Sequence, residues 1–426
     1  MPFDRAAALS WYARNRERSR ALFDMLPEDV YYTRPIDLRH PVVFYDGHLP
    51  GFSFNTLVKR ALGRPSIDAR LESLFARGID PHESNGSGAP DAWPSRDVVR
   101  AFVKEADARV VEVLTHDDLD RPGDPLLSHA DAVFTILEHE AMHQETLLYM
   151  WHRLPFSQKI RPADYAPQTE AAVPPDEWCD VPGGSATLGA DRDALPFGWD
   201  NELPSCTAEV ATFQIQRHNV TNARFMEFVD AGGYRDSRWW SADDWRWVQS
   251  QKLSHPLFWE HQDGSWYWRG MFELIPLPVA WPVYVSQAEA SAYARWHGCR
   301  LATEAEYQRS AVGAAPGLCD FESWDPEPAG ARARVASEYG VEDLVGNGWE
   351  WTSSRFGPFP GFRASASYPE YSADFFDGEH FVMKGASPAT ARELLRPTFR
   401  NWFRARYPYV YATFRCVRPE PSERIR

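Results

Sequence analysis

The sequence predicts a chain of two domains, a helical bundle followed by an α+β domain. Up to about residue 160, apolar side chains recur at helical spacing with few strand-like alternations. Beyond that point, short β-like runs alternate with turn-rich segments that hold most of the 18 tryptophans. A length of 426 residues is also too great for one ordinary core. We therefore expect a bundle over 1–161, a polar, proline-containing linker over 162–177 and an α+β domain over 178–426.

Apolar periodicity places the individual elements. Four amphipathic helices are expected in the first domain, over 5–25, 50–62, 95–114 and 128–152. In the second domain only two helices are clear, near 221–231 and 286–297, with β-like runs at 212–215 and 282–285. A four-helix bundle commonly builds metal sites from side chains on facing helices.

Composition excludes several classes of function. A net charge of −15 disfavours nucleic acid and anionic membranes as partners, because phosphate neutralisation needs clustered Lys and Arg. No apolar run is long enough to span a bilayer, and the first thirty residues lack the apolar segment of a signal peptide. The five cysteines are widely spaced and form no C-x-x-C pair. We expect a cytoplasmic protein with reduced thiols.

The segment His139-Glu140-Ala141-Met142-His143 places two imidazoles four positions apart in a helical run. Residues at this spacing share one helix face, so both rings can reach a single metal ion. The same pattern is the zinc-peptidase signature, with the glutamate as general base. A peptidase would need a substrate-binding strand beside an exposed metal, and no strand is expected before this helix. Different metal chemistry is therefore favoured, with hydrogen-bonded core histidines as the structural alternative.

Longer motifs in the second half carry a family resemblance. They are Val181-Pro182-Gly183-Gly184, Phe197–Glu202 (FGWDNE), Val220-Thr221-Asn222, Arg300–Glu306 (RLATEAE) and Gly346–Trp351 (GNGWEW). Together they resemble the formylglycine-generating-enzyme-like fold, a relative of C-type lectins. Preceded by a DinB-like four-helix bundle with H-E-x-x-H-x-E, the chain resembles the iron(II)-dependent sulfoxide synthases of ergothioneine and ovothiol biosynthesis. The selenoneine synthases are close relatives with the same plan.

The resemblance implies an Fe(II) site with three histidine ligands. His139 and His143 would be two of them, and the third would come from the segment Pro41–His48, which makes it His48, with His40 as the competitor. Imidazole suits iron, and three ligands leave positions open for substrate and dioxygen. One of the polar neighbours on the same helix would accept an imidazole N–H and fix the ring; the candidates are Glu140, Gln144 and Glu145.

The family's Y-x-x-Y pair is matched by Tyr368-Pro369-Glu370-Tyr371. By this resemblance Tyr368 is the proton donor and Tyr371 gives a hydrogen bond to substrate. Plain packing is the alternative for both rings, because the domain is rich in aromatic side chains.

Asn401 and Trp402 carry over as contacts to an amino-acid-like substrate. Phe403 stands where actinobacterial relatives have Asp, and Met142 stands where they have Gln, so the pocket is less polar here. Aromatic faces can hold a quaternary ammonium by cation–π attraction of about 0.5–2 kcal/mol per ring. This favours hercynine, the N-trimethylated histidine, over free histidine.

The second substrate is less well indicated. Arg70 and Arg77 lie where relatives clamp the carboxylates of γ-glutamylcysteine, although an exposed helix face explains both equally well. Pro388 replaces a Trp of the usual G-G-S-W-A pattern, which would widen the donor pocket. We therefore favour a selenoneine synthase that forms a C–Se bond from a selenosugar. The alternatives are a hercynyl-cysteine sulfoxide synthase using cysteine or γ-glutamylcysteine, and a lectin-like binding protein without catalysis.

Overall fold

The computed structural model describes residues 3–76, 93–332 and 336–419. It divides into a helical unit, Met1–Ala163 with Ser365–Glu370, and an α+β unit, Asp164–Ala364 with Tyr371–Arg426. The domain boundaries and the linker expected from the sequence stay predictions. Within the expected linker, Tyr165 donates a hydrogen bond to Asp325 (2.6 Å), and the Gln168 carbonyl accepts one from Trp281 (2.7 Å), both inside the α+β unit.

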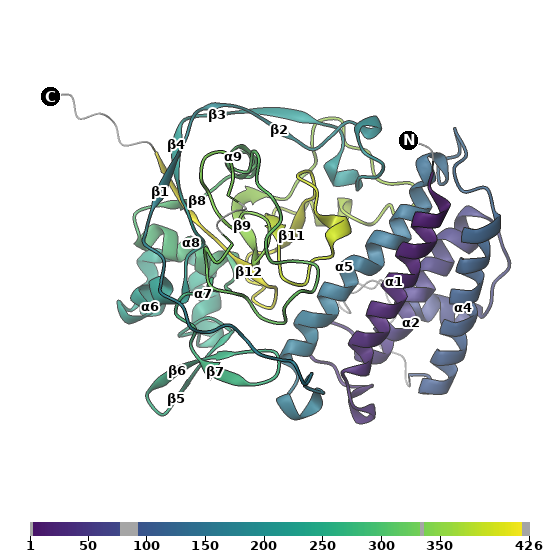
Figure 1. Ribbon diagram of the computed structural model, residues 1–426, viewed down its shortest axis with the longest axis horizontal. Helices are drawn as coiled ribbons and strands as arrows, with labels where there is room; N and C mark the ends of the chain where they lie inside the picture. Colours follow the sequence, from purple (N-terminus) through teal and green to yellow (C-terminus); the bar gives the residue numbers. More distant parts are fainter. Residues whose placement is uncertain (1–2, 77–92, 333–335, 420–426) are drawn as a thin grey trace. The chain divides into compact units, whose positions relative to one another are not determined.

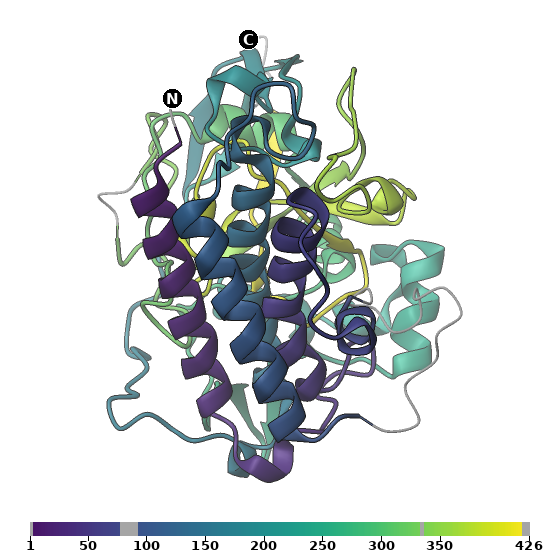
Figure 2. The ribbon, with the colours of Figure 1, turned by 90° about the vertical axis from the view of Figure 1, so that its right-hand side faces the viewer.

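Four helices of the helical unit run side by side (Figures 1 and 2): α1 (Arg5–Asp24), α2 (Val42–Ser53), α4 (Arg96–His116) and α5 (Asp131–Arg153). The short α3 (Ala69–Phe75) lies against α2, and a π-helix, η2 (Phe54–Ala61), continues α2 directly. A core of buried side chains from α1, η2, α4 and α5 holds these helices together, with Tyr12, Leu57, Val110 and Ile136 among its members.

The second predicted helix, over 50–62, was given a start too far along the chain, since α2 begins at Val42. Gly47 and Pro50 obscure it in the sequence, because both residues are poor helix formers. Packing explains the glycine. A Cβ atom at Gly47 would come within 2.4 Å of the Phe75 ring, so only glycine lets α3 approach α2 this closely. The consequence for function is that His48 lies on a helix.

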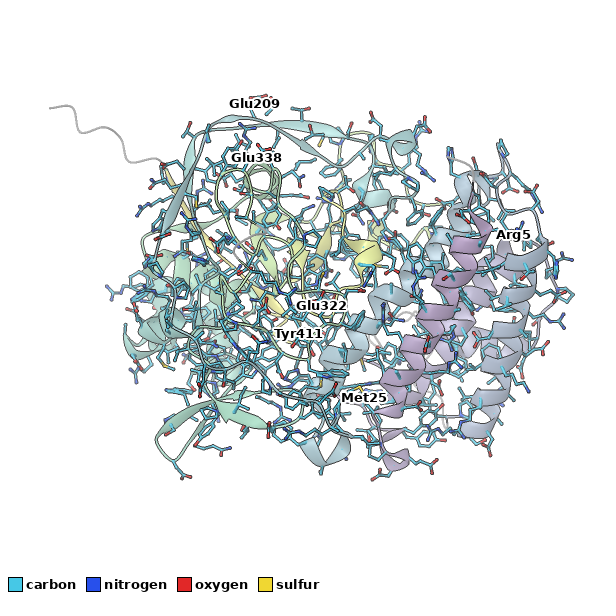
Figure 3. All side chains as sticks on the ribbon, viewed as in Figure 1. Arg5, Met25, Glu209, Glu322, Glu338 and Tyr411 are labelled. Atoms are coloured by element: carbon cyan, nitrogen blue, oxygen red, sulfur yellow. The ribbon has the colours of Figure 1, made fainter. Side chains whose placement is uncertain are left out.

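Polar side chains complete the bundle at its ends and along one seam. Arg5, labelled in Figure 3, donates to the carbonyl of Asp117 (2.6 Å) just after α4, where helix carbonyls lack partners. Between α1 and α5, the Asn15 side chain donates to the backbone carbonyl of Leu137 (2.8 Å). The backbone carbonyl of Asn15 accepts from the Gln144 side chain (2.9 Å). These bonds fix the axial position of α5, which carries the H-E-x-x-H segment.

The α+β unit contains two four-stranded sheets, in the orders β1-β4-β13-β8 and β11-β10-β9-β12, a hairpin β2-β3 and a three-stranded sheet β5-β6-β7. β12 runs parallel to β9, and the other pairs are antiparallel. The strands are β1 (Trp178–Val181), β2 (Gly184–Leu188), β3 (Cys206–Val210), β4 (Phe213–Gln216), β5 (Trp259–Gln262), β6 (Ser265–Arg269), β7 (Leu274–Pro276), β8 (Arg300–Leu301), β9 (Gly348–Arg355), β10 (His380–Ala386), β11 (Asn401–Arg404), β12 (Ala412–Thr413) and β13 (Cys416–Pro419).

The helices of this unit are α6 (Asn222–Asp230), α7 (Ala242–Gln251), α8 (Gln287–Trp296) and α9 (Glu304–Ser310). The sequence predicted α6 and α8 and missed the other two. For α9 a signal was present, since Thr303 and Glu306 form a capping box at its start. The expected strand at 282–285 was wrong, because Pro282 forms only an isolated bridge with Thr221.

Three ion pairs hold glutamates of the family motifs in this unit, and in the first two both partners are buried. Arg415 meets Glu350 (2.6 Å), Arg400 meets Glu304 (2.8 Å), and Arg396 meets Glu202 (2.8 Å). The mixed architecture confirms the predicted fold class of a helical bundle followed by an α+β domain. Among the described residues, no helix combines the length and apolar character needed to cross a membrane.

Candidate metal centre

Helices α2 and α5 bring three histidines together inside the helical unit. His139 and His143 occupy successive turns of α5, and His48 reaches them from α2. One ring nitrogen from each lies within 4.8 Å of the other two, and the Nε2 atoms of His48 and His143 are 3.3 Å apart. All three side chains are buried. In the described part of the chain, this is the one group of His, Cys, Asp or Glu side chains arranged to hold a metal ion.

The site keeps its imidazoles neutral, which is the form that binds metals. Burial lowers the pKa of His48 to about 4. Burial, with smaller contributions from neighbouring charges, lowers the pKa of His139 and His143 well below the ordinary value. The Nδ1–H of His48 donates to the Phe75 carbonyl (2.7 Å). This hydrogen bond assigns the proton to Nδ1, so the lone pair of Nε2 is the one that can bind a metal.

The spacing fits a divalent transition metal. Two imidazole nitrogens bound to one ion at about 2.1 Å and at right angles are about 3 Å apart, close to the separation between His48 and His143. The Nδ1 atoms of His139 and His143 are buried and have no hydrogen-bond partner among the described residues. Such groups are costly in an apolar interior unless the ring gains a compensating interaction.

The expected hydrogen-bond partners of the imidazoles were wrong for two residues. Glu140 accepts from Arg16 (2.7 Å) and Ser19 (2.6 Å), and Gln144 donates to Ser19 (3.1 Å), so both side chains face α1. The physical reason is helix geometry, since a residue next to a histidine in sequence points about 100° away around the axis. A carboxylate engaged in this way is also poorly placed to act as the general base of a peptidase.

Two aromatic rings border the histidines. Phe52 stacks on His139 with ring centroids 3.5 Å apart and planes 9° apart. The Tyr368 ring, in the segment of the helical unit that comes from 365–370, lies 5.1 Å from Phe52 and 6.0 Å from His139. Sequence reasoning singled out Tyr368 and missed Phe52. The signal was available, because Phe52 follows His48 by four positions on one helix.

The other predicted residues of the helical unit lie apart from this group or outside the description. His40 stacks on Phe44 (4.1 Å) and does not join the three histidines. Met142 is half-buried on α5, between the two histidines in sequence. Arg70 is exposed in the first turn of α3, and Arg77 lies outside the described residues.

Two of the predicted substrate residues of the α+β unit, Tyr371 and Trp402, lie in one aromatic cluster. Tyr371 stacks on Trp199 (3.8 Å) and points edge-on at Trp402 (5.1 Å). One face of Trp402 is covered by Phe356, at 4.2 Å and nearly parallel. Trp402 lies on β11 between Asn401 and Phe403. The Asn401 side chain accepts from the backbone N–H of Trp402 (2.9 Å), and the Phe403 ring stacks on Tyr407 (5.0 Å).

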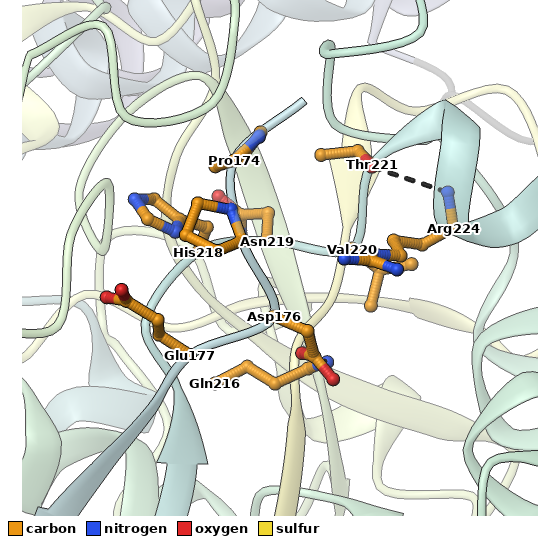
Figure 4. Close-up of a pocket in the computed structure, with 10 residues that line it drawn as sticks. Pro174, Asp176, Glu177, Gln216, His218, Asn219, Val220, Thr221 and Arg224 are labelled. Carbon is orange, nitrogen blue, oxygen red and sulfur yellow. Dashed lines mark hydrogen bonds between the residues drawn. The ribbon is translucent and has the colours of Figure 1, made fainter. Parts of the chain in front are cut away.

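A shallow pocket at the start of the α+β unit is a weaker candidate (Figure 4). Several of its polar groups are paired with neighbours, such as Glu177 with Arg217 (2.7 Å) and His218 with Glu342 (3.2 Å). Asp176 accepts from Gln216 (2.9 Å), and the Thr221 side chain caps the backbone N–H of Arg224 (3.4 Å, dashed in Figure 4). This pocket lacks the convergent lone pairs of the histidine site.

Two families match the two parts of the chain. The DinB superfamily matches residues 12–147, and the sulfatase-modifying factor enzyme 1-like domain matches residues 163–326 and 319–420. The chain is similar to hercynine oxygenase of Mycolicibacterium smegmatis, with 35% identity over 299 residues, or 63% of this chain and 67% of that protein. Hercynine oxygenase of Mycobacterium tuberculosis is 35% identical over 303 residues, or 66% of this chain and 69% of that protein.

A fungal relative aligns over a longer stretch. Ergothioneine biosynthesis protein 1 of Schizosaccharomyces pombe is 30% identical over 448 aligned positions, which cover 92% of this chain and 54% of that protein. The chain thus spans about two thirds of the mycobacterial relatives and about half of the fungal one.

Proposed function

This chain belongs to the ergothioneine/ovothiol sulfoxide synthase family, and from that premise we propose that it is a non-haem iron(II) enzyme acting on hercynine. The observation that carries the proposal is the buried trio His48, His139 and His143 with its converging nitrogens. The reaction proposed is oxidative joining of a thiol to C2 of the hercynine imidazole, with the product at the sulfoxide level.

The reaction balances with dioxygen as the oxidant. The S–H bond of the thiol and the C2–H bond of the imidazole break, and a C–S bond and an S–O bond form. One oxygen atom stays in the sulfoxide, and the other leaves as water with the two hydrogens. Four electrons pass from the two organic substrates to dioxygen, so no further reductant is needed.

In this proposal His48, His139 and His143 hold the ferrous ion, which supplies the redox chemistry that lets dioxygen react with closed-shell substrates. The Phe75 carbonyl fixes the ring of His48 through its Nδ1–H. Phe52 covers one face of the His139 ring and so restricts its rotation. Three protein ligands leave room for both substrates and dioxygen, and holding them together lowers the entropic cost of the encounter.

Tyr368 is proposed as the proton donor, because a phenol O–H can hold or deliver a proton next to the histidines. Tyr371, Asn401 and Trp402 remain proposed substrate contacts, and Met142 and Phe403 remain proposed substrate-binding residues of low polarity. Hercynine is preferred over histidine on the aromatic argument, since a trimethylammonium group has no N–H to donate. Arg70 and Arg77 stay proposed contacts to the carboxylates of the thiol donor.

We propose sulfur, and not selenium, as the atom joined to the hercynine imidazole. The relatives are hercynine oxygenases and ergothioneine biosynthesis proteins, which favour the sulfur alternative from the sequence analysis. Pro388, whose smaller side chain was the argument for a wider donor pocket, is itself buried, and its carbonyl accepts from the backbone N–H of Phe321 (2.8 Å). A selenosugar therefore enters the experiment as a competing donor.

The test is an anaerobic assay of the iron-loaded protein with hercynine and one donor at a time, followed by dioxygen. The donors are cysteine, γ-glutamylcysteine and a selenosugar, and the products are identified by mass spectrometry. We expect a hercynyl sulfoxide with at least one thiol and little product from free histidine. Product from the selenosugar alone would restore the selenium hypothesis. No product with any donor, from protein holding one iron per chain, would refute the proposed reaction.

The non-catalytic alternative, a lectin-like binding protein, is separated by metal content. The proposal requires about one iron per chain, lost in His139→Ala. A protein that binds no iron, or that binds it equally well after this substitution, would favour the alternative.

A further inference from the structure

The segment Ser365–Glu370 is tied to the rest of the helical unit by two hydrogen bonds at Ser367. Ser367 is buried, and its hydroxyl donates to the Asp131 carboxylate (2.6 Å). The Ser367 carbonyl accepts a longer bond from Arg60 (3.4 Å). Within the segment, the Ser365 hydroxyl accepts from the backbone N–H groups of Ser367 and Tyr368 (3.2 Å each). The backbone that leads into Tyr368 is therefore held at Ser367 and at the Tyr368 N–H.

The anchor and the proposed metal ligands share one helix. Asp131 is the first residue of α5, and His139 and His143 follow it by eight and twelve positions. Each step of four residues turns about 40° around the helix axis, so His139 lies about 80° and His143 about 120° around the axis from Asp131. Eight residues correspond to about 12 Å of helix rise. A regular helix thus fixes the distance between the anchor and His139.

We propose that Ser367 and Asp131 form a clasp that positions Tyr368 beside His139. The proposal rests on the proposed function, because it treats Tyr368 as the proton donor. Ser367 directly precedes Tyr368, so the anchored backbone leaves the tyrosine ring little freedom apart from its own side-chain rotations. That ring lies between Phe52 and His139. Ser367 and Asp131 act through Tyr368 and are positioning residues.

The clasp predicts a specific kinetic pattern. In Ser367→Ala the hydroxyl is lost, the segment samples other positions, and kcat falls by about tenfold to a hundredfold, the range expected when a catalytic group is misplaced by about 1 Å. The KM for hercynine changes little. Ser367→Thr keeps a hydroxyl and restores most of kcat. Asp131→Asn keeps an acceptor oxygen without the charge and lies between the wild type and Ser367→Ala.

A double-mutant cycle separates positioning from general damage. If Ser367 acts only through Tyr368, Ser367→Ala causes no further loss of kcat in the Tyr368→Phe background. Ser66→Ala is the matched control, because Ser66 makes the same kind of serine-to-carboxylate bond, to Glu72 (2.7 Å), elsewhere in the helical unit. The control leaves kcat unchanged. Equal losses from Ser367→Ala in both backgrounds would overturn the proposal.

A second measurement does not depend on turnover. Hydrogen exchange of the amides of 365–370 becomes faster in Ser367→Ala than in wild type and in Ser66→Ala, while iron content stays the same. Unchanged exchange would overturn the clasp even in an active enzyme. If the wild type gives no product with any donor, the proposed function fails, and the exchange data still decide whether the clasp holds the segment.

Discussion

Two buried polar sites of this protein, one in each unit, are built in opposite ways. In the α+β unit, Arg415 and Glu350 face each other through two hydrogen bonds, of 2.8 and 2.6 Å, and Arg415 also donates to three backbone carbonyls. In the helical unit, three buried imidazoles converge, and two of their Nδ1 atoms have no partner among the described residues. A satisfied network stabilises a fold, whereas converging free lone pairs prepare a site for a ligand.

The largest effect is expected from disrupting the buried ion pair between Arg415 and Glu350. Arg415→Met leaves Glu350 buried without its counter-charge, and we expect a loss of about 3–5 kcal/mol in the free energy of unfolding. Thermal and denaturant unfolding of the metal-free protein would measure it. Arg238→Met is the control, since Arg238 is 76% exposed in its pair with Asp236 and its replacement leaves stability unchanged. A neutral Arg415→Met would show that the network does not hold the unit together.

The opposite result is expected at the histidines. Replacing a buried imidazole by an apolar side chain of similar size removes a poorly satisfied group, so His139→Leu leaves the stability of the metal-free protein nearly unchanged. If the trio binds ferrous iron as proposed, we expect iron at one hundred times its dissociation constant to stabilise the wild type by about 2.7 kcal/mol and His139→Leu to lose this gain. Unfolding with and without iron under anaerobic conditions provides the measurement.

His40→Leu is the matched control for the iron experiment. His40 is also buried and was the rival third ligand, but it stacks on Phe44 away from the trio. Its replacement keeps the stabilisation by iron. If His40→Leu loses that stabilisation and His48→Leu retains it, the assignment of the third ligand is incorrect.

The sequence predicted much of this contrast, and its failures have physical causes. Helical spacing was enough to place α1, α4 and α5 and to pair His139 with His143. It could not place α2, because Gly47 and Pro50 are poor helix formers, and the packing reason for Gly47 is the Phe75 ring, which is distant in sequence. The partners of Glu140 were missed for the same reason, since Arg16 and Ser19 come from a helix far away in sequence. The motifs that carry the family resemblance supply Glu304 and Glu350, whose buried pairs with Arg400 and Arg415 are structural.

Glu140 sharpens the comparison, because it sits inside the H-E-x-x-H segment and yet is paired with Arg16 and Ser19 through one carboxylate oxygen. Glu140→Gln removes the charge opposite Arg16, which keeps its second carboxylate partner, Asp107 (2.9 Å). We expect a loss of about 1–3 kcal/mol in the free energy of unfolding with unchanged iron affinity. A tenfold or greater fall in iron affinity would instead assign Glu140 to the metal site, as for a residue that orients a ligand.

The smallest effect is expected at a half-buried pair in the α+β unit, where His297 and Asp176 lie 3.7 Å apart. The interaction with Asp176 raises the pKa of His297 above its ordinary value, so the protonated imidazole stabilises the fold below about pH 6.5. This contribution disappears as pH rises through the raised pKa, while Asp176, whose pKa is lowered by the same bond, stays ionised. The difference in Tm between wild type and His297→Gln therefore shrinks from pH 6 to pH 9.

Cys299 has the opposite effect on the pH dependence of stability, because its hydrogen bond with Cys416 lowers the thiol pKa to about 7. Both proteins are therefore compared in a Cys299→Ser background. A Tm difference that is constant or grows with pH would mean that this partly exposed pair contributes nothing as an ion pair.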